Sequence, residues 1–261
     1  MISPINSRKA PKQRLQQLLI ISTLVLGLTA AFDHTAIAQM SPDLVLSQLP
    51  PPAPRTPPPN KTDVGGGLND SHSCGTAQEQ LMALLPTKNP VQTISAHPTI
   101  LFYIPYRAED VATGEFSVLT WPDEITRVYR TQFTLPQTLG ITSISLPKLP
   151  QSTLEEGKFY HWYIKLYCQG NHEPLVVHGW IQRVAATPER ERQIETSSPD
   201  VWYDSIARLS DRLRTDPQND ELRAQWRNLL TLIGTENLAQ KPIVGPVQLL
   251  ENRADSKPIS Y

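Results

Sequence analysis

The chain has 261 residues, of which 24 are Lys or Arg, 25 are Asp or Glu and 25 are Pro. A net charge this close to zero excludes a strongly basic protein, and it argues against a nucleic-acid partner and against strong attraction to anionic lipid. The prolines are unevenly spread, so we expect the folded part to be shorter than the chain.

Residues 1–38 have the three parts of a secretory signal peptide: a basic start, an apolar run over residues 18–31 and a small-x-small cleavage site over residues 36–38. The alternative, an uncleaved anchor, needs about 20 apolar residues, and this run is shorter. Cleavage would leave Gln39 first and remove four basic residues and one acidic residue, so that 20 Lys and Arg face 24 Asp and Glu. No cysteine follows at the cleavage site and no second long apolar segment exists in the sequence. We therefore predict an exported protein, periplasmic or extracellular, with no transmembrane segment after cleavage.

Residues 39–71 are rich in proline and glycine and read as a disordered tether. Proline clusters favour extended polyproline II, and the glycine triplet at 65–67 behaves as flexible coil. A role as a PxxP-type ligand is the alternative to a plain linker. We expect the segment 40–67 to be dispensable for folding.

Residues 72–187 contain short apolar segments separated by proline and glycine, which is the spacing of a mainly β protein, a β-sandwich that is Ig-like in general architecture. The turn at Pro122-Asp123-Glu124 predicts that the strands on either side of it pair. Residues 78–85 fit either a short helix or an edge strand. The strands expected before the central hairpin are residues 99–106, 115–121, 125–135 and 141–146.

Residues 159–184 predict a β-hairpin, because two runs dense in aromatic and β-branched residues flank a break that contains Gly170-Asn171. Period-two alternation sorts the first arm into two faces. The face expected to point into the core carries Tyr160, Trp162, Ile164, Leu166 and Cys168. The other face carries Phe159, His161, Tyr163, Lys165 and Tyr167.

The two cysteines, Cys74 and Cys168, both lie in the part expected to be exported, where a disulfide is the simplest interpretation. The bond would close a loop of about 95 residues and pin the segment before Leu81 against the hairpin. The alternatives are two unrelated buried thiols and, more weakly, a metal site.

After residue 187 the period changes from two to about 3.6, which predicts helices. A short helix is expected over residues 188–195. Ser198 and Pro199 then begin a helix that carries Trp202, and the next helix carries Trp226 and ends at Gly234. Residues 188–236 therefore predict a helical hairpin that must dock on the β-domain or on a partner. We expect residues 237–261 to be a disordered tail.

Several short motifs together resemble the secreted, mainly cyanobacterial proteins grouped as domain of unknown function family 928. The resemblance covers about residues 72–238. It implies an exported protein with the paired cysteines, and it supplies no activity, ligand or catalytic residue. The motifs are Cys74, LMALLP at 81–86, HPT at 97–99, FYIPY at 102–106, VYRT at 128–131, FTLP at 133–136, LEEGK at 154–158, GWIQRV at 179–184 and VWYD at 201–204.

Four histidines, His97, His161, His172 and His178, invite a metal interpretation, and pairing of the hairpin could bring His161 near His178. Two ligands are too few for zinc, and neither an HExxH nor a CxxC motif is present, so we predict no metal and no cofactor. The G-x-S-x-G elbow of serine hydrolases is also missing, and we predict no catalytic residue.

The remaining candidate is an aromatic surface made by Phe159, Tyr163 and Tyr167, with Tyr103 or Tyr106 beside them. If exposed, it would bind a sugar or the edge of a protein. If the helices that carry Trp202 and Trp226 cover it, it is a second core.

These patterns favour an exported, non-enzymatic binding or structural module of the cell envelope, whose partner is an unknown envelope protein or polysaccharide. The alternative is an extracytoplasmic hydrolase with an unrecognised active site. A nucleophile and a base within hydrogen-bond reach in a pocket would favour the hydrolase.

Overall fold

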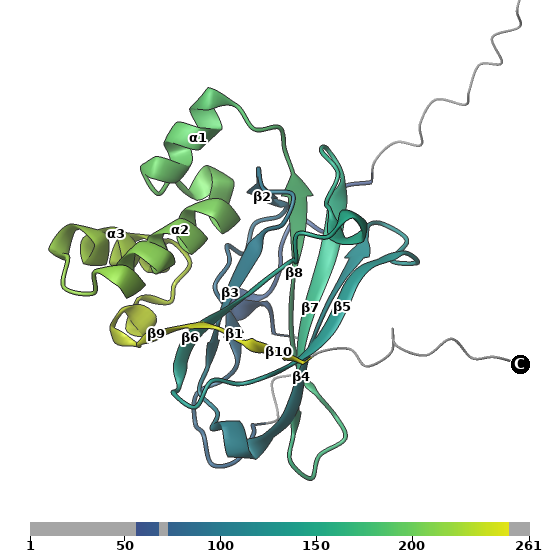
Figure 1. The fold of residues 1–261 in the computed structure, drawn as a ribbon, viewed down its shortest axis with the longest axis vertical. Coiled ribbons are helices and arrows are strands. Elements are labelled where there is room, and N and C mark those ends of the chain that lie inside the picture. Colours follow the sequence, from purple (N-terminus) through teal and green to yellow (C-terminus); the bar gives the residue numbers. More distant parts are fainter. Residues whose placement is uncertain (1–55, 68–72, 251–261) are drawn as a thin grey trace, which may run out of the picture. The chain divides into compact units, whose positions relative to one another are not determined.

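The computed structural model of the chain describes residues 56–67 and 73–250, and its strands form two sheets (Figure 1). The four-stranded sheet has the order β1-β3-β6-β9, and the six-stranded sheet has the order β10-β5-β4-β7-β8-β2. The strands are β1 (Met82–Ala83), β2 (Val91–Thr93), β3 (Thr99–Ile104), β4 (Val111–Thr120), β5 (Arg127–Thr134), β6 (Gly140–Ser145), β7 (Phe159–Cys168), β8 (Leu175–Arg183), β9 (Ile243–Pro246) and β10 (Gln248–Leu250). The helices are α1 (Pro188–Glu195), α2 (Trp202–Thr215) and α3 (Asp220–Leu232), with short 3-10 turns η1 (Val64–Gly66), η2 (Ala108–Asp110), η3 (Pro150–Ser152), η4 (Pro199–Val201) and η5 (Glu236–Gln240).

The predicted mainly β, sandwich-like fold is confirmed, and one core lies between the two sheets. The rings of Phe102 on β3 and Phe133 on β5 have centroids 6.3 Å apart, so the sheets meet through their side chains. Trp162 and Ile164 on β7 are fully buried in this core. Each such side chain contributes about 1.5 to 3 kcal/mol by leaving water.

The central hairpin is confirmed as the antiparallel pair β7 and β8, and its predicted core face is buried at every second position from Tyr160 to Cys168. The pairing predicted across Pro122-Asp123-Glu124 is confirmed as β4 with β5. Of the two alternatives for residues 78–85, the edge strand is correct: β1 lies at the end of the four-stranded sheet and pairs with β3.

The predicted disulfide between Cys74 and Cys168 is confirmed, with Cα atoms 5.2 Å apart. Both residues are buried and belong to the core, as expected for a cysteine on the inward face of β7. The bond attaches the segment that precedes β1 to the last residue of β7.

One helix, α2, packs on the four-stranded sheet. Helix α2 packs on β3 and β9 and also touches the edge strand β2, and α3 packs on α2 (Figure 1). The indole of Trp202 donates a hydrogen bond to the carbonyl of Leu84 at 2.8 Å. The interpretation of the aromatic face of β7 as a second core beneath these helices is therefore wrong. Within the described ranges, no helix is both long and apolar enough to cross a bilayer.

Two segments predicted to be disordered are part of the fold. In the expected tail, β9 pairs with β6 and β10 pairs with β5, so residues 243–250 extend both sheets. In the expected tether, residues 56–67 form η1 and pair with the body of the domain at Lys88 and Val177. The tether prediction is thus wrong for 56–67. The predicted signal peptide, the rest of the tether and residues 251–261 lie outside the described residues.

Candidate functional site

Four ring side chains lie together on the face of the six-stranded sheet that points away from the core, which we call the outer face. The antiparallel register places His161 of β7 opposite Trp180 of β8, and Tyr163 opposite His178. Opposite side chains on one face of an antiparallel pair are close neighbours. The rings of His161 and Trp180 stack with centroids 4.0 Å apart and an angle of 16° between their planes. The imidazole of His161 and the phenol of Tyr163 have centroids 4.2 Å apart.

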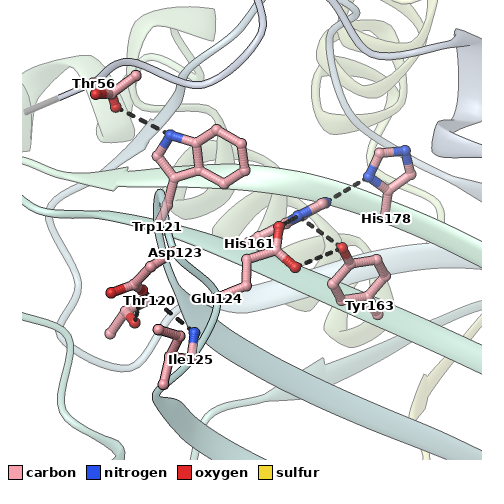
Figure 2. Close-up of polar contacts among 9 residues, drawn as sticks. All are labelled: Thr56, Thr120, Trp121, Asp123, Glu124, Ile125, His161, Tyr163 and His178. Atoms are coloured by element: carbon pink, nitrogen blue, oxygen red, sulfur yellow. Dashed lines mark hydrogen bonds and ion pairs between the residues drawn. The ribbon is translucent and has the colours of Figure 1, made fainter.

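A chain of hydrogen bonds joins Glu124, His161 and His178, which we call the histidine relay (Figure 2). The Glu124 Oε1 atom lies 2.6 Å from His161 Nδ1, and His161 Nε2 lies 2.6 Å from His178 Nδ1. The hydroxyl of Tyr163 donates to Glu124 Oε2 at 3.0 Å. With Nδ1–H of His161 donating to the carboxylate, its Nε2 accepts from Nδ1–H of His178, and each contact has a donor and an acceptor.

The turn between β4 and β5 brings Trp121 and Glu124 onto this face. Glu124 has φ of +53°, in the left-handed region that costs a residue other than glycine about 1 to 2 kcal/mol. The two hydrogen bonds to its carboxylate and the bond from its backbone N–H to the carbonyl of Thr120 hold it there. The same turn sets the Trp121 ring edge-on to Trp180, with centroids 5.9 Å apart.

Because they are buried, both histidines of the relay are uncharged at neutral pH. Burial lowers the pKa of His161, and the neighbouring Glu124 carboxylate offsets only part of this effect. Burial and the neighbouring His161 lower the pKa of His178 to about 4. Burial, and then Glu124, raises the pKa of the Tyr163 phenol. The contact between His161 and Glu124 is therefore a hydrogen bond between a neutral imidazole and a carboxylate.

Residues 56–67, which we call the strap, run beside this cluster. The carbonyl of Thr56 accepts a hydrogen bond from the Trp121 indole at 3.0 Å (Figure 2). Gly66 has φ of +68°, and a Cβ atom there would lie 2.4 Å from the carbonyl oxygen of His178, so the strap packs directly on β8. Between these points the backbone bonds of the strap to the body are Asn89 N–H to Asn60 O and Thr62 N–H to Thr87 O.

Three of the five residues predicted to form the binding surface, Phe159, Tyr163 and Tyr167, lie on the outer face of β7 and are half-buried. Tyr163 is tied to the relay through its hydroxyl. Tyr167 lies at the far end of the strand, near the ion pair of Arg130 with Glu115.

The other two, Tyr103 and Tyr106, do not join them. Tyr103 belongs to β3 of the four-stranded sheet and Tyr106 follows that strand, and both are buried. The Tyr103 hydroxyl donates to Glu79, and the Tyr106 hydroxyl accepts from the backbone N–H of Leu81. Their predicted place on the binding surface is therefore wrong.

The hairpin predicts that His161 could lie near His178, and His161 Nε2 is 2.6 Å from His178 Nδ1. This distance is shorter than the one between two ligands of the same zinc ion. Two histidine ligands of a tetrahedral zinc, with Zn–N bonds of about 2.0 Å, hold their nitrogens about 3.3 Å apart. The observed contact is a hydrogen bond between the two rings. In the described part of the chain, no group of three or more His, Cys, Asp or Glu side chains is placed to hold a metal ion.

The site also contains residues that the sequence did not reveal. The sequence predicts Glu124 only as part of a turn, and the outer face that it predicts does not include Trp121 or Trp180. The alternation in residues 175–183 would have placed Trp180 beside His178, two positions along the same strand face.

A groove of about 690 Å³ lies elsewhere, between the residues around β2 and helix α1. Its lining carries both signs of charge, from Lys88 and Arg190 and from Glu189 and Asp200. It contains none of the predicted site residues.

The chain matches a family of proteins and has low similarity to solved structures. The model of the family described as Domain of Unknown Function (DUF928) matches residues 64–243. No curated protein matches the chain. Among solved structures, the chain is similar to astrotactin-2, a conserved vertebrate-specific and perforin-like membrane protein involved in neuronal development, with 12% identity and a TM-score of 0.28. That match covers 58% of this chain and 28% of that structure. The fn3 domain of human collagen alpha-1(XX) matches with 10% identity and a TM-score of 0.24, over 46% of this chain and 93% of the domain.

Proposed function

The chain belongs to the DUF928 family, and because the description of that family assigns no activity, we propose a function from the site itself: an exported, non-enzymatic binding module of the cell envelope. The observation that carries this proposal is the cluster of Trp121, His161 and Trp180 on the outer face, in which Trp121 is half-buried and His161 and Trp180 are buried. Large flat rings bury much area and lose little conformational entropy when they bind. Phe159 and Tyr167 extend the surface along β7.

The state of the acid and base groups supports binding rather than catalysis. The lowered pKa of His178 makes it a weak base, and the raised pKa of Tyr163 makes its phenol a poor nucleophile. The hydrogen bonds of Glu124, which join the β4–β5 turn to the hairpin, fix the rings instead.

The disulfide supports export, since such bonds persist in oxidising compartments. In this proposal the protein works in the periplasm or outside the cell, with an envelope protein or polysaccharide as partner. Its body is an Ig-like sandwich, and α2 with α3 forms a helical hairpin that rests on the four-stranded sheet through α2.

The histidine relay favours one second candidate, an extracytoplasmic hydrolase, because a carboxylate and two imidazoles in series can move a proton. Among the described residues, the only hydroxyl or thiol hydrogen-bonded to the relay is that of Tyr163. Hydrolysis of a panel of activated esters by the full chain tests this candidate. A rate that His161→Gln abolishes would establish it, and a rate equal to that in buffer would remove it.

Co-sedimentation of the full chain with isolated envelope fragments tests the binding module. We expect Trp121→Ala to weaken binding at least about tenfold, the loss typical of an aromatic anchor. The control is Leu232→Ala, an exposed apolar residue of α3 on the opposite side of the fold. Wild-type binding by Trp121→Ala, with an unchanged melting temperature, would show that the aromatic surface is not the binding site.

A further inference from the structure

The first residues of the strap are Thr56-Pro57-Pro58-Pro59-Asn60, a segment with three prolines in a row. Successive prolines favour the extended polyproline II conformation and have no backbone N–H, so their carbonyls are the only polar groups of the backbone. The carbonyl of Thr56 accepts from the Trp121 indole at 3.0 Å. Pro58 is buried, whereas Pro57 and Pro59 on either side of it are exposed.

Proteins that bind polyproline segments do so with grooves lined by aromatic rings. Trp121 and Trp180 provide such rings, because their planes meet at 89° with centroids 5.9 Å apart. Trp180 is buried but stands outside the main core of the domain. Among the described residues, its indole N–H finds no hydrogen-bond partner. A buried tryptophan usually has one. Next to Trp121 there is thus a second indole N–H, which is buried and which residues 56–60 leave unpaired.

We propose that the surface of Trp121 and Trp180 is a recognition site for proline-rich polypeptide in the polyproline II conformation, and that residues 56–60 occupy it in cis. The inference deepens the proposed binding function and rests on it, by naming the class of partner. The occupant in trans is a proline-rich segment of another envelope protein, chemically equivalent to the segment already seated there.

The contacts that hold the strap on the domain allow residues 56–60 to be replaced by a segment of another protein. The backbone bonds at Asn60 and Thr62 and the packing of Gly66 on β8 do not involve the prolines. Thr56 and the prolines after it can therefore move away from Trp121 while the remainder of the strap stays bound. A segment tethered so closely competes at an effective concentration in the millimolar range, so it weakens binding of any ligand in trans.

The test is fluorescence anisotropy of a labelled peptide with the sequence PPPAPRTPPPNK, taken from residues 50–61, titrated with the full chain. The control peptide has alanine in place of every proline. We expect the proline peptide to bind and the alanine peptide not to bind. Equal binding of both peptides, or of neither, would overturn the proposal.

Three variants of the full chain sharpen the test. The triple variant Pro57→Ala, Pro58→Ala, Pro59→Ala weakens the cis segment, and we expect it to bind the proline peptide at least about tenfold more tightly. Trp121→Phe keeps a ring but removes the indole N–H, and we expect it to bind about threefold to tenfold more weakly. Ile125→Ala changes a residue of the same turn that is 82% exposed, and its affinity should be unchanged. Unchanged affinity of the triple variant, or an equal loss in Ile125→Ala and Trp121→Phe, would refute the recognition site.

Two further measurements separate this inference from the function on which it rests. If the chain sediments with envelope fragments but does not bind the proline peptide, the polyproline site is wrong and the binding module stands. A dimer in analytical ultracentrifugation that the triple variant abolishes would instead identify a second copy as the occupant and overturn the assignment to a partner protein.

Discussion

Removal of the disulfide should destabilise the domain more than any single surface change. Cys74 and Cys168 are separated by 94 positions. In the chain-entropy model a closed loop of about 95 residues stabilises the folded state by about 4.7 kcal/mol at 25 °C. A domain of about 150 to 250 residues shifts its melting temperature by about 2 to 4 °C per kcal/mol, so the expected decrease is about 9 to 19 °C.

The measurement is thermal unfolding followed by circular dichroism, with and without reductant. The double variant Cys74→Ala, Cys168→Ala is the control, because it lacks both thiols and places no unpaired hydroxyl in the core. Reductant should lower the melting temperature of the native chain toward that of the variant and leave the variant unchanged. A native melting temperature that full reduction does not move, with thiol titration showing that both cysteines are free, would refute the loop argument.

Three other changes test separate contacts. Tyr203→Phe removes the hydroxyl that accepts from the buried indole N–H of Trp162 at 2.8 Å. Urea unfolding should show a free energy of unfolding lowered by about 1 to 3 kcal/mol, because the donor stays buried without an acceptor. A loss below about 0.5 kcal/mol would mean that the indole N–H finds another partner. The pKa of His178 is about 4 in the folded chain and near 6.5 in the unfolded chain, so the unfolded state binds more protons between these pH values. The free energy of unfolding should therefore fall by up to about 3 kcal/mol as the pH drops from about 6.5 to 4. Urea titrations at each pH measure this change. His178→Gln should flatten this profile, and an identical profile in the variant would assign the effect to other groups. Gly66→Ala adds a Cβ atom against the backbone of β8 at positive φ and should lower the free energy of unfolding by at least about 1 kcal/mol. In the control, Gly67→Ala, the added Cβ meets no atom within 4 Å and should change the free energy of unfolding little. Equal effects of the two variants would contradict the packing of the strap on β8.

The hairpin could be predicted because its side chains alternate over two long strands. The same alternation placed His161 and His178 on neighbouring positions and sent Cys168 inward. Glu124 could not be predicted as part of the site, because it lies 37 positions from His161 and reaches it only through the geometry of a tight turn.

The strap and the last two strands escaped prediction for different reasons. A run of prolines has the same composition whether it is free in solvent or packed on the domain, so composition alone could not reveal the contact of Thr56 with Trp121. The strands β9 and β10 have four and three residues, which is too short for a period to be visible. Their pairing depends on strands more than 90 positions earlier in the chain.

Those two final strands also determine when the domain can be completed during synthesis. Until residues 243–250 have left the ribosome, β6 and β5 each lack a neighbour and present open backbone edges. Contacts between such distant segments form slowly, because a long loop must close before they stabilise anything. Both sheets of the nascent chain therefore gain their last strand only after more than 100 further residues have followed the strands with which β9 and β10 pair.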